Sequence, residues 1–106
     1  MTTNRLIERM EQGRIVLGDG AMGTMLHLSG MTAGDSSELW NVTHPEVIYD
    51  IHKAYAVAGA RVVTANTFGG NRGRLQHNGL EDRVVELNKA AIDIARRVAD
   101  EYDCLI

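Results

Sequence analysis

The stretch LGDGAMGTM, residues 17–25, follows a short apolar run and carries three closely spaced glycines. Residues 18–23 within it fit the pattern G-x-G-x-x-G, which binds phosphate in dinucleotide domains. That pattern also needs an acidic residue for the ribose about 20 residues further on. Glu38 has this spacing but lies in a polar loop, and Asp19 inside the turn would repel a pyrophosphate. The stretch therefore does not predict a dinucleotide site, and Asp19 becomes its most informative residue.

Apolar runs and helical patterns alternate along the rest of the chain. Short apolar or β-branched runs predict three strands, at residues 15–17, 61–67 and 104–106. Helical periodicity and end signals predict helices between them, with a polar loop at residues 29–38. The expected helices are a short N-terminal helix with Leu6, Ile7 and Met10 on one face, residues 22–28, a helix from Pro45 to Gly59, and residues 80–102. Strands that alternate with helices imply parallel pairing, so the predicted fold class is α/β.

Two of these helices carry recognisable start signals. Pro45 falls in the first turn of its helix, with Thr43 or His44 as the expected cap. Asn78 and Glu81 resemble a capping pair before the long helix. A stripe at helical spacing predicts which side chains of the long helix face the core: Val84, Asn88, Ala91, Ile92, Ala95, Val98, Ala99 and Tyr102.

The bulk properties exclude several classes of function. The chain has 106 residues and a net charge of −3, so no basic surface points to nucleic acid. No apolar run approaches the roughly 20 residues that cross a bilayer, and the N-terminal residues lack the apolar region of a signal peptide. The single cysteine, Cys104, rules out an internal disulfide. We therefore expect a cytoplasmic protein with no nucleic-acid or membrane partner.

The C-terminal residues bear on the extent of the fold. A parallel strand is normally covered by helices on both faces. The third expected strand begins at residues 104–106, and no helix follows it. Because two complete strands with their helices make a poor core, we expect a truncated chain, the N-terminal part of a larger domain. The alternative is a complete small domain with an edge strand at its C-terminus.

Asp19 lies at the carboxyl end of the first expected strand, where parallel α/β folds bind their ligands. The glycines beside it expose backbone N–H groups that can form an anion-binding concavity. This pairing suits a zwitterion, because Asp19 would take an ammonium group and the N–H groups of Gly20 and its neighbours a carboxylate. Asp19 could instead cap the short helix that begins near Met22. Taken alone, the segment favours the cap without excluding an amino-acid ligand.

Three segments together resemble the N-terminal region of the homocysteine S-methyltransferase domain. They are GDGAMGT at residues 18–24, ELWNVTHPEVIYDIHKAYAVAGARVVTANTFGGNR at 38–72, and GLEDRVVELNKAAIDIARRVAD at 79–100. This domain occurs in cobalamin-dependent methionine synthase, in betaine–homocysteine methyltransferase and in the S-methylmethionine-dependent enzymes, and the chain resembles the methionine synthase branch more closely. The resemblance implies that residues 1–106 form a partial homocysteine-binding domain. It would be the N-terminal portion of a (β/α)8 TIM barrel, with about two and a half βα units.

The same resemblance implies a transferase. The family moves a methyl group onto the sulfur of homocysteine to give methionine, from methylcobalamin, S-methylmethionine or betaine, with cobalamin as a candidate carrier. Zinc binds the substrate thiol and keeps it as the nucleophilic thiolate. The three zinc-binding cysteines of the family lie in the later half of the barrel, and Cys104 matches none of them. We therefore expect no metal ligand and no catalytic residue in this chain, which alone would be inactive; Cys104 is interpreted as a small buried residue.

What carries over to this chain is half of the substrate pocket. The matching positions are Asp19 for the homocysteine amino group, Gly20 and Ala21 for its carboxylate through their backbone, and Asn66, Thr67 and Phe68 for the lining of the pocket mouth. The resemblance thus favours the substrate role of Asp19 over the cap. Trp40 and Asn41 stay open, since Trp40 also suits a cover for the apolar side of the following helix. The alternative function is a stand-alone α/β amino-acid-binding module without metal or catalysis.

Overall fold

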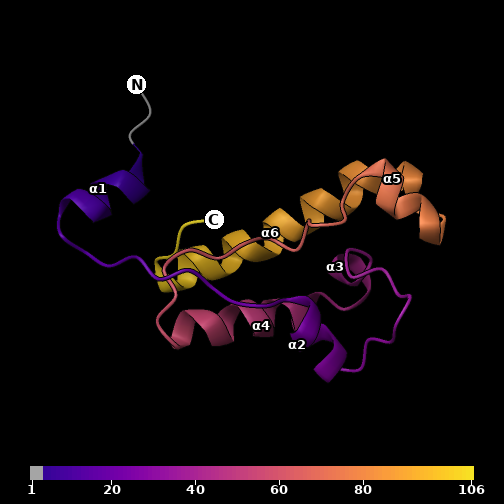
Figure 1. The fold of residues 1–106 in the computed structure, drawn as a ribbon, viewed down its shortest axis with the longest axis horizontal. Coiled ribbons are helices and arrows are strands. Elements are labelled where there is room, and N and C mark those ends of the chain that lie inside the picture. Colours follow the sequence, from indigo (N-terminus) through magenta and orange to yellow (C-terminus); the bar gives the residue numbers. More distant parts are fainter. Residues whose placement is uncertain (1–3) are drawn as a thin grey trace.

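The computed structural model describes residues 4–106, which form six α-helices and two short 3₁₀ helices. Figure 1 shows their arrangement, with α1 at the edge of the molecule and α4 beside α6. In chain order the elements are α1 (Arg5–Glu11), α2 (Gly23–Leu28), α3 (Trp40–Thr43), α4 (Pro45–Val57), α5 (Arg72–Leu75), η1 (Gln76–Asn78), η2 (Glu81–Arg83) and α6 (Val84–Tyr102). No helix within these residues combines the length and the apolar composition needed to cross a bilayer.

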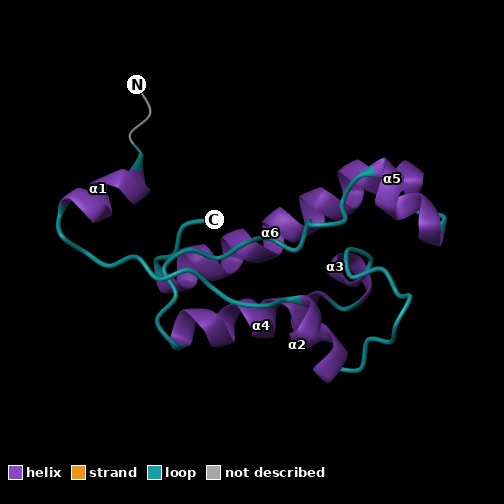
Figure 2. Cartoon of the chain, in the orientation of Figure 1, coloured by secondary structure: helices purple, strands orange, loops and turns teal. Residues whose placement is uncertain are grey.

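The three segments predicted as strands are extended loops, and residues 4–106 contain no strand (Figure 2). Isolated parallel bridges join them, one between Gly18 and Val62 and one between Val62 and Leu105. The predicted parallel pairing is therefore confirmed, with the second segment in the middle, whereas the predicted strands are wrong. The outer edge of the first segment lies open, since Ile15 is 95% and Leu17 55% exposed. A parallel strand is normally buried on both faces. Because this edge is open, the pairing is limited to single bridges.

The main core lies where α4 and α6 pack against the middle extended segment. Pro45 begins α4 as predicted, but the side chain of His44 makes no capping hydrogen bond and instead stacks on Trp40, with ring centroids 3.9 Å apart. The helix ends at the expected place because Gly59 adopts a φ of +117°, which favours glycine. The buried residues of this core are Tyr49, Ala56, Val63, Ala95, Val98, Ala99 and Cys104. The prediction that Cys104 is buried is thus confirmed.

The long helix α6 begins later than predicted, at Val84, after the 3₁₀ turn of η2. The expected capping pair is wrong, because the side-chain amide of Asn78 donates to the Gly34 carbonyl at 2.8 Å. The predicted stripe is largely buried, but Ile92 is 37% exposed and Leu87 is fully buried in its place. Alanines along the stripe have small side chains, which lets α6 approach α4 closely.

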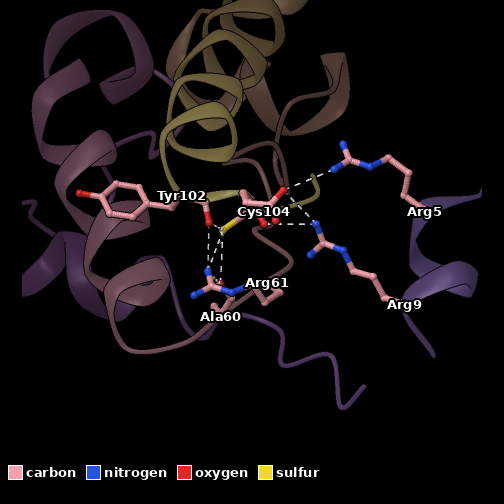
Figure 3. Close-up of polar contacts among 7 residues, drawn as sticks. Arg5, Arg9, Ala60, Arg61, Tyr102 and Cys104 are labelled. Atoms are coloured by element: carbon pink, nitrogen blue, oxygen red, sulfur yellow. Dashed lines mark hydrogen bonds and ion pairs between the residues drawn. The ribbon is translucent and has the colours of Figure 1, made fainter. Parts of the chain in front are cut away.

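Helix α1 is attached to the far end of α6 by charged groups rather than by its apolar face. The apolar side chains of α1 are exposed, with Ile7 at 49% and Met10 at 60%. The buried Arg9 donates from Nη2 to Asp103 Oδ1 at 3.1 Å and to the Asp103 carbonyl at 3.3 Å. Arg5 reaches the same carboxylate oxygen at 3.4 Å (Figure 3). The position of α1 therefore depends mainly on arginine contacts to one residue.

Candidate functional site

A cavity of about 480 Å³ opens where the first two extended segments end. This is the end of parallel pairing at which α/β folds place their ligands. Its lining residues are Asp19, Gly20, Met22, Gly23, Ser37, Thr64, Ala65, Asn66, Thr67 and Phe68. Five of the six residues predicted for the substrate pocket are therefore brought together around one cavity. Ala21 is the exception.

Asp19 joins the ends of the first two segments. Its Oδ2 accepts a hydrogen bond from the Thr64 backbone N–H at 2.8 Å, and its Oδ1 accepts one from the Thr64 hydroxyl at 3.1 Å. The N-cap of α2 is Met22, without any side-chain capping bond, so the cap hypothesis for Asp19 is wrong. An ionised carboxylate offers about four lone-pair sites, so these two bonds leave capacity for a ligand while they fix the orientation of the group.

Gly20 and Ala21 meet the side chain of Tyr55 from α4. A Cβ at Gly20 would lie 2.9 Å from Cε1 of the Tyr55 ring, so this position requires glycine unless the ring moves. The Tyr55 hydroxyl donates to the Ala21 carbonyl at 2.7 Å. Tyr55 thereby holds the backbone of this turn from the side of α4, and Ala21 contributes to its shape without lining the cavity.

The three predicted residues of the second segment play different parts. Asn66 is buried, and its side-chain amide donates to the Ser37 carbonyl at 2.8 Å and to Asn41 Oδ1 at 3.0 Å. The Thr67 backbone N–H donates to the Ala65 carbonyl at 2.9 Å, which turns the chain. Phe68 stands at the rim with 92% of its surface exposed. Asn66 thus supports the wall, whereas Phe68 is available to a ligand.

Thr64 and Ser37 line the cavity but were not predicted. Side chains two residues apart in extended chain lie on the same face. Thr64 stands two residues before Asn66, so this alternation could have suggested Thr64, although Ala65 and Thr67 line the cavity as well. Ser37 lies in the polar loop, where no local pattern sets its position.

Glu38 is a buried carboxylate behind the cavity wall, 6% exposed. Its Oε2 accepts hydrogen bonds from the Gly69 N–H at 3.2 Å and from the Ser37 hydroxyl at 2.9 Å. A Cβ at Gly69 would lie 2.7 Å from Oε1 of Glu38, so the glycine allows this close approach. Glu38 thereby fixes the turn that follows the second segment. Trp40, whose role the sequence left open, packs against the apolar residues of α2 and α4, which supports its interpretation as a cover.

His52 of α4 is fully buried, and within residues 4–106 neither ring nitrogen has a hydrogen-bond partner. Burial lowers the pKa of His52 below its ordinary value, and the nearby negative charge of Asp19 opposes this shift only in part. The neutral imidazole is therefore the form that fits the fold.

The residues that the structure describes do not fit a zinc site. Residues 4–106 contain no group of three His, Cys, Asp or Glu side chains placed to hold a metal ion. The Cys104 thiol donates to the Ala60 carbonyl at 3.3 Å and lies 3.5 Å from Nη1 of Arg61 (Figure 3), and it does not line the cavity. A structural or catalytic zinc site takes at least three protein ligands, which these residues do not supply.

Comparison with known proteins identifies the family. The sequence profile described as homocysteine S-methyltransferase matches residues 16–106. The chain belongs to the homocysteine S-methyltransferase family. The resemblance drawn from the sequence is thereby confirmed, and the cavity lies within the matched residues.

Two relatives illustrate the family in different enzymes. Methionine synthase from Mycobacterium tuberculosis is 43% identical over 94 residues, which covers 83% of this chain and 8% of that protein. Betaine–homocysteine S-methyltransferase 1 from Sus scrofa is 34% identical over 106 residues, covering 95% of this chain and 38% of that protein. The chain therefore spans less than two fifths of the length of either relative.

A solved structure shares the fold. The metallated form of the homocysteine methyltransferase MmuM from Escherichia coli superposes with a TM-score of 0.81 at 28% identity. The match covers 93% of this chain and 35% of that one. The oxidised form of the same enzyme gives a TM-score of 0.75. The arrangement of helices around three paired segments is thus that of one part of a homocysteine methyltransferase.

Proposed function

We propose that this chain forms the amino-acid-binding part of a homocysteine S-methyltransferase, an enzyme that transfers a methyl group to homocysteine and yields methionine. In the proposal, residues 1–106 are a partial homocysteine-binding domain, the N-terminal portion of a (β/α)8 barrel. The observation that carries it is the oriented Asp19 carboxylate at the edge of a cavity large enough for an amino acid. Membership of the family supports the choice of homocysteine.

Each end of homocysteine has a counterpart around the cavity. Asp19 would accept hydrogen bonds from the ammonium group, and the two contacts to Thr64 hold its carboxylate in place for this task. The backbone at Gly20, which lines the cavity, would meet the carboxylate of the ligand, and Ala21 would only shape this turn. Phe68 at the rim offers an apolar surface to the side chain that ends in sulfur.

The proposal gives this chain substrate binding and no catalytic residue. The described residues do not fit a zinc site, so zinc ligands and any cobalamin would belong to parts of the enzyme outside residues 4–106. Among the branches of the family, the methionine synthase branch is favoured. Its support is the 43% identity with that enzyme, against 34% with the betaine-dependent one.

The test compares L-homocysteine with two analogues that each lack one charged end. 4-Mercaptobutanoate lacks the amino group, and 3-mercaptopropylamine lacks the carboxylate. Titrations of the chain under reducing conditions, followed by ¹H–¹⁵N spectra, should show homocysteine shifting the Thr64 and Thr67 amides. Each analogue should bind about tenfold more weakly or worse, because a charge-assisted hydrogen bond contributes roughly 1.5–3 kcal/mol. Equal binding of 4-mercaptobutanoate, or no binding of homocysteine, would refute the proposal.

A further inference from the structure

We infer that Asn41 of α3 is the positioning residue of the cavity, which it shapes without touching the ligand. The inference rests on the proposed function for its ligand, although its geometric part concerns the free chain. Asn41 lies outside the cavity lining and is 2% exposed. Sequence patterns leave its role open, because its partners come from two other parts of the chain.

Asn41 and Asn66 form a reciprocal pair of side chains. Nδ2 of Asn41 donates to the Asn66 carbonyl at 3.0 Å and to the Leu87 carbonyl at 3.2 Å. Oδ1 of Asn41 accepts from Nδ2 of Asn66 at 3.0 Å, and the second hydrogen of that amide goes to the Ser37 carbonyl at 2.8 Å. Both amide nitrogens therefore use their two hydrogens. An apolar or shorter side chain at position 41 would leave buried carbonyl groups without partners.

These bonds connect two walls of the cavity to the rigid core. Ser37 and Asn66 both line the cavity, whereas Leu87 is a fully buried residue of α6. Asn41 anchors the Asn66 wall to α6 directly and the Ser37 wall through the Asn66 amide. Networks of fully bonded buried polar groups fix one geometry. The spacing between these walls, and so the fit of the ligand between them, depends on Asn41.

Asn88 provides a matched control on α6. Its Nδ2 also donates to two carbonyl groups, Gly70 at 2.8 Å and Val84 at 2.7 Å. None of these three residues lines the cavity. Replacement of Asn88 by serine thus removes a similar pair of bonds from the same region of the core. A merely structural role for Asn41 predicts the same consequences for both replacements.

The experiment compares Asn41→Ser with Asn88→Ser in the 106-residue chain. Both variants should lose thermal stability, but only Asn41→Ser should weaken L-homocysteine binding, by about tenfold, the equivalent of one or two buried hydrogen bonds. Asn88→Ser should stay within about twofold of the wild type. Asn41→Asp is the second variant, since it keeps the shape and the acceptor oxygen and loses both donors. It should weaken binding in the same way.

Amide hydrogen exchange in the free chain separates this inference from the proposed function. In Asn41→Ser, exchange of the Thr64 and Thr67 amides should accelerate about tenfold, with no such change in Asn88→Ser. If the wild type does not bind homocysteine, the proposed function is refuted. The hydrogen-exchange result alone then tests whether Asn41 positions the cavity walls. Unchanged exchange in both Asn41 variants, or equal loss of affinity in Asn41→Ser and Asn88→Ser, overturns the positioning role.

Discussion

The two ends of the paired segments are held together by different kinds of contact. At the cavity end, Asn41 and Asn66 are at most 5% exposed, and their amides bond to backbone from three parts of the chain. At the opposite end, α1 exposes its apolar face, with Ile7 at 49%, and its side-chain hydrogen bonds to residues distant in the sequence run from Arg5 and Arg9 to Asp103. The buried amides at the cavity end are thus fully bonded to backbone from several segments, whereas the apolar side chains of α1 face solvent.

This contrast shows which part of the chain has contacts that fix a single arrangement of its segments. Buried polar groups with fixed partners permit one arrangement, whereas an exposed ion pair contributes about 0–1 kcal/mol. The pair of Arg5 with Asp103 is of the second kind, since the two side chains are 62% and 77% exposed, and the exposed carboxylate also weakens the pair with Arg9, whose side chain is 10% exposed. We therefore expect the cavity end to keep its shape in this chain and α1 to contribute little to stability.

We expect the largest effect in the free energy of unfolding, when an apolar side chain is shortened at the cavity end and at the α1 end. Leu26 of α2 is fully buried in the cluster with Met31, Ile48 and Ile51, and Leu26→Ala should lower the free energy of unfolding by about 2–5 kcal/mol. Ile7→Ala in α1 should change it by no more than about 0.5 kcal/mol. Leu28→Ala is the matched control within α2, since Leu28 is 77% exposed. Urea unfolding measures all three, and a similar loss for Leu26 and Ile7 would remove the contrast.

We expect a smaller effect on the pH dependence of stability, which comes from the binding of one proton by His52. Burial lowers the pKa of this histidine in the folded chain, so the unfolded chain binds the proton first as the pH falls. The stability that His52 contributes is therefore complete above its unfolded pKa of about 6.5 and is lost as the pH falls through the lower folded value. His52→Leu should flatten the decline in stability between pH 7 and pH 5.

The control for this pH effect is His77→Leu, which replaces an exposed histidine of η1. Its stability should decline with acid as steeply as that of the wild type. Thermal unfolding at several pH values gives the comparison. A wild-type slope retained in His52→Leu would show that the buried imidazole does not govern the acid response of the cavity end.

Local sequence signals were sufficient where one residue decides the structure. Pro45 and Gly59 mark the two ends of α4, because one fits the first helical turn and the other a positive φ. The alternation of helices and apolar runs predicted the parallel pairing of the three segments. The family resemblance, rather than a local signal, assigned Asp19 and Asn66 to one pocket, and the structure places both at the same cavity. Their role toward homocysteine stays a prediction.

Features that depend on distant partners could not be predicted. The three segments predicted as strands are loops joined by single bridges. A local run of apolar residues cannot specify this, because strand pairing depends on the neighbouring segments. The bond from Thr64 to Asp19 follows from the register of the first two segments. The contacts of Asn41 join residues up to 46 positions apart. Short elements such as α3 and α5 have four residues each, too few for a periodic pattern.

The claim that the cavity binds an amino acid through Asp19 is tested most directly by Asp19→Asn. Asparagine can keep both contacts to Thr64, because its Oδ1 can accept from the backbone N–H and its Nδ2 can donate to the hydroxyl. The substitution therefore removes the negative charge with little effect on folding, which thermal unfolding would verify.

Isothermal titration of L-homocysteine into the wild type and Asp19→Asn is the deciding measurement. A charge-assisted hydrogen bond contributes roughly 1.5–3 kcal/mol, so the Kd should rise about ten- to a hundredfold in the variant. 4-Mercaptobutanoate, which has no ammonium group, should bind Asp19→Asn at least as tightly as the wild type, because the substitution also removes a charge of the same sign. Equal homocysteine affinities in two stably folded proteins would contradict the account and leave Asp19 as a link between the first two segments alone.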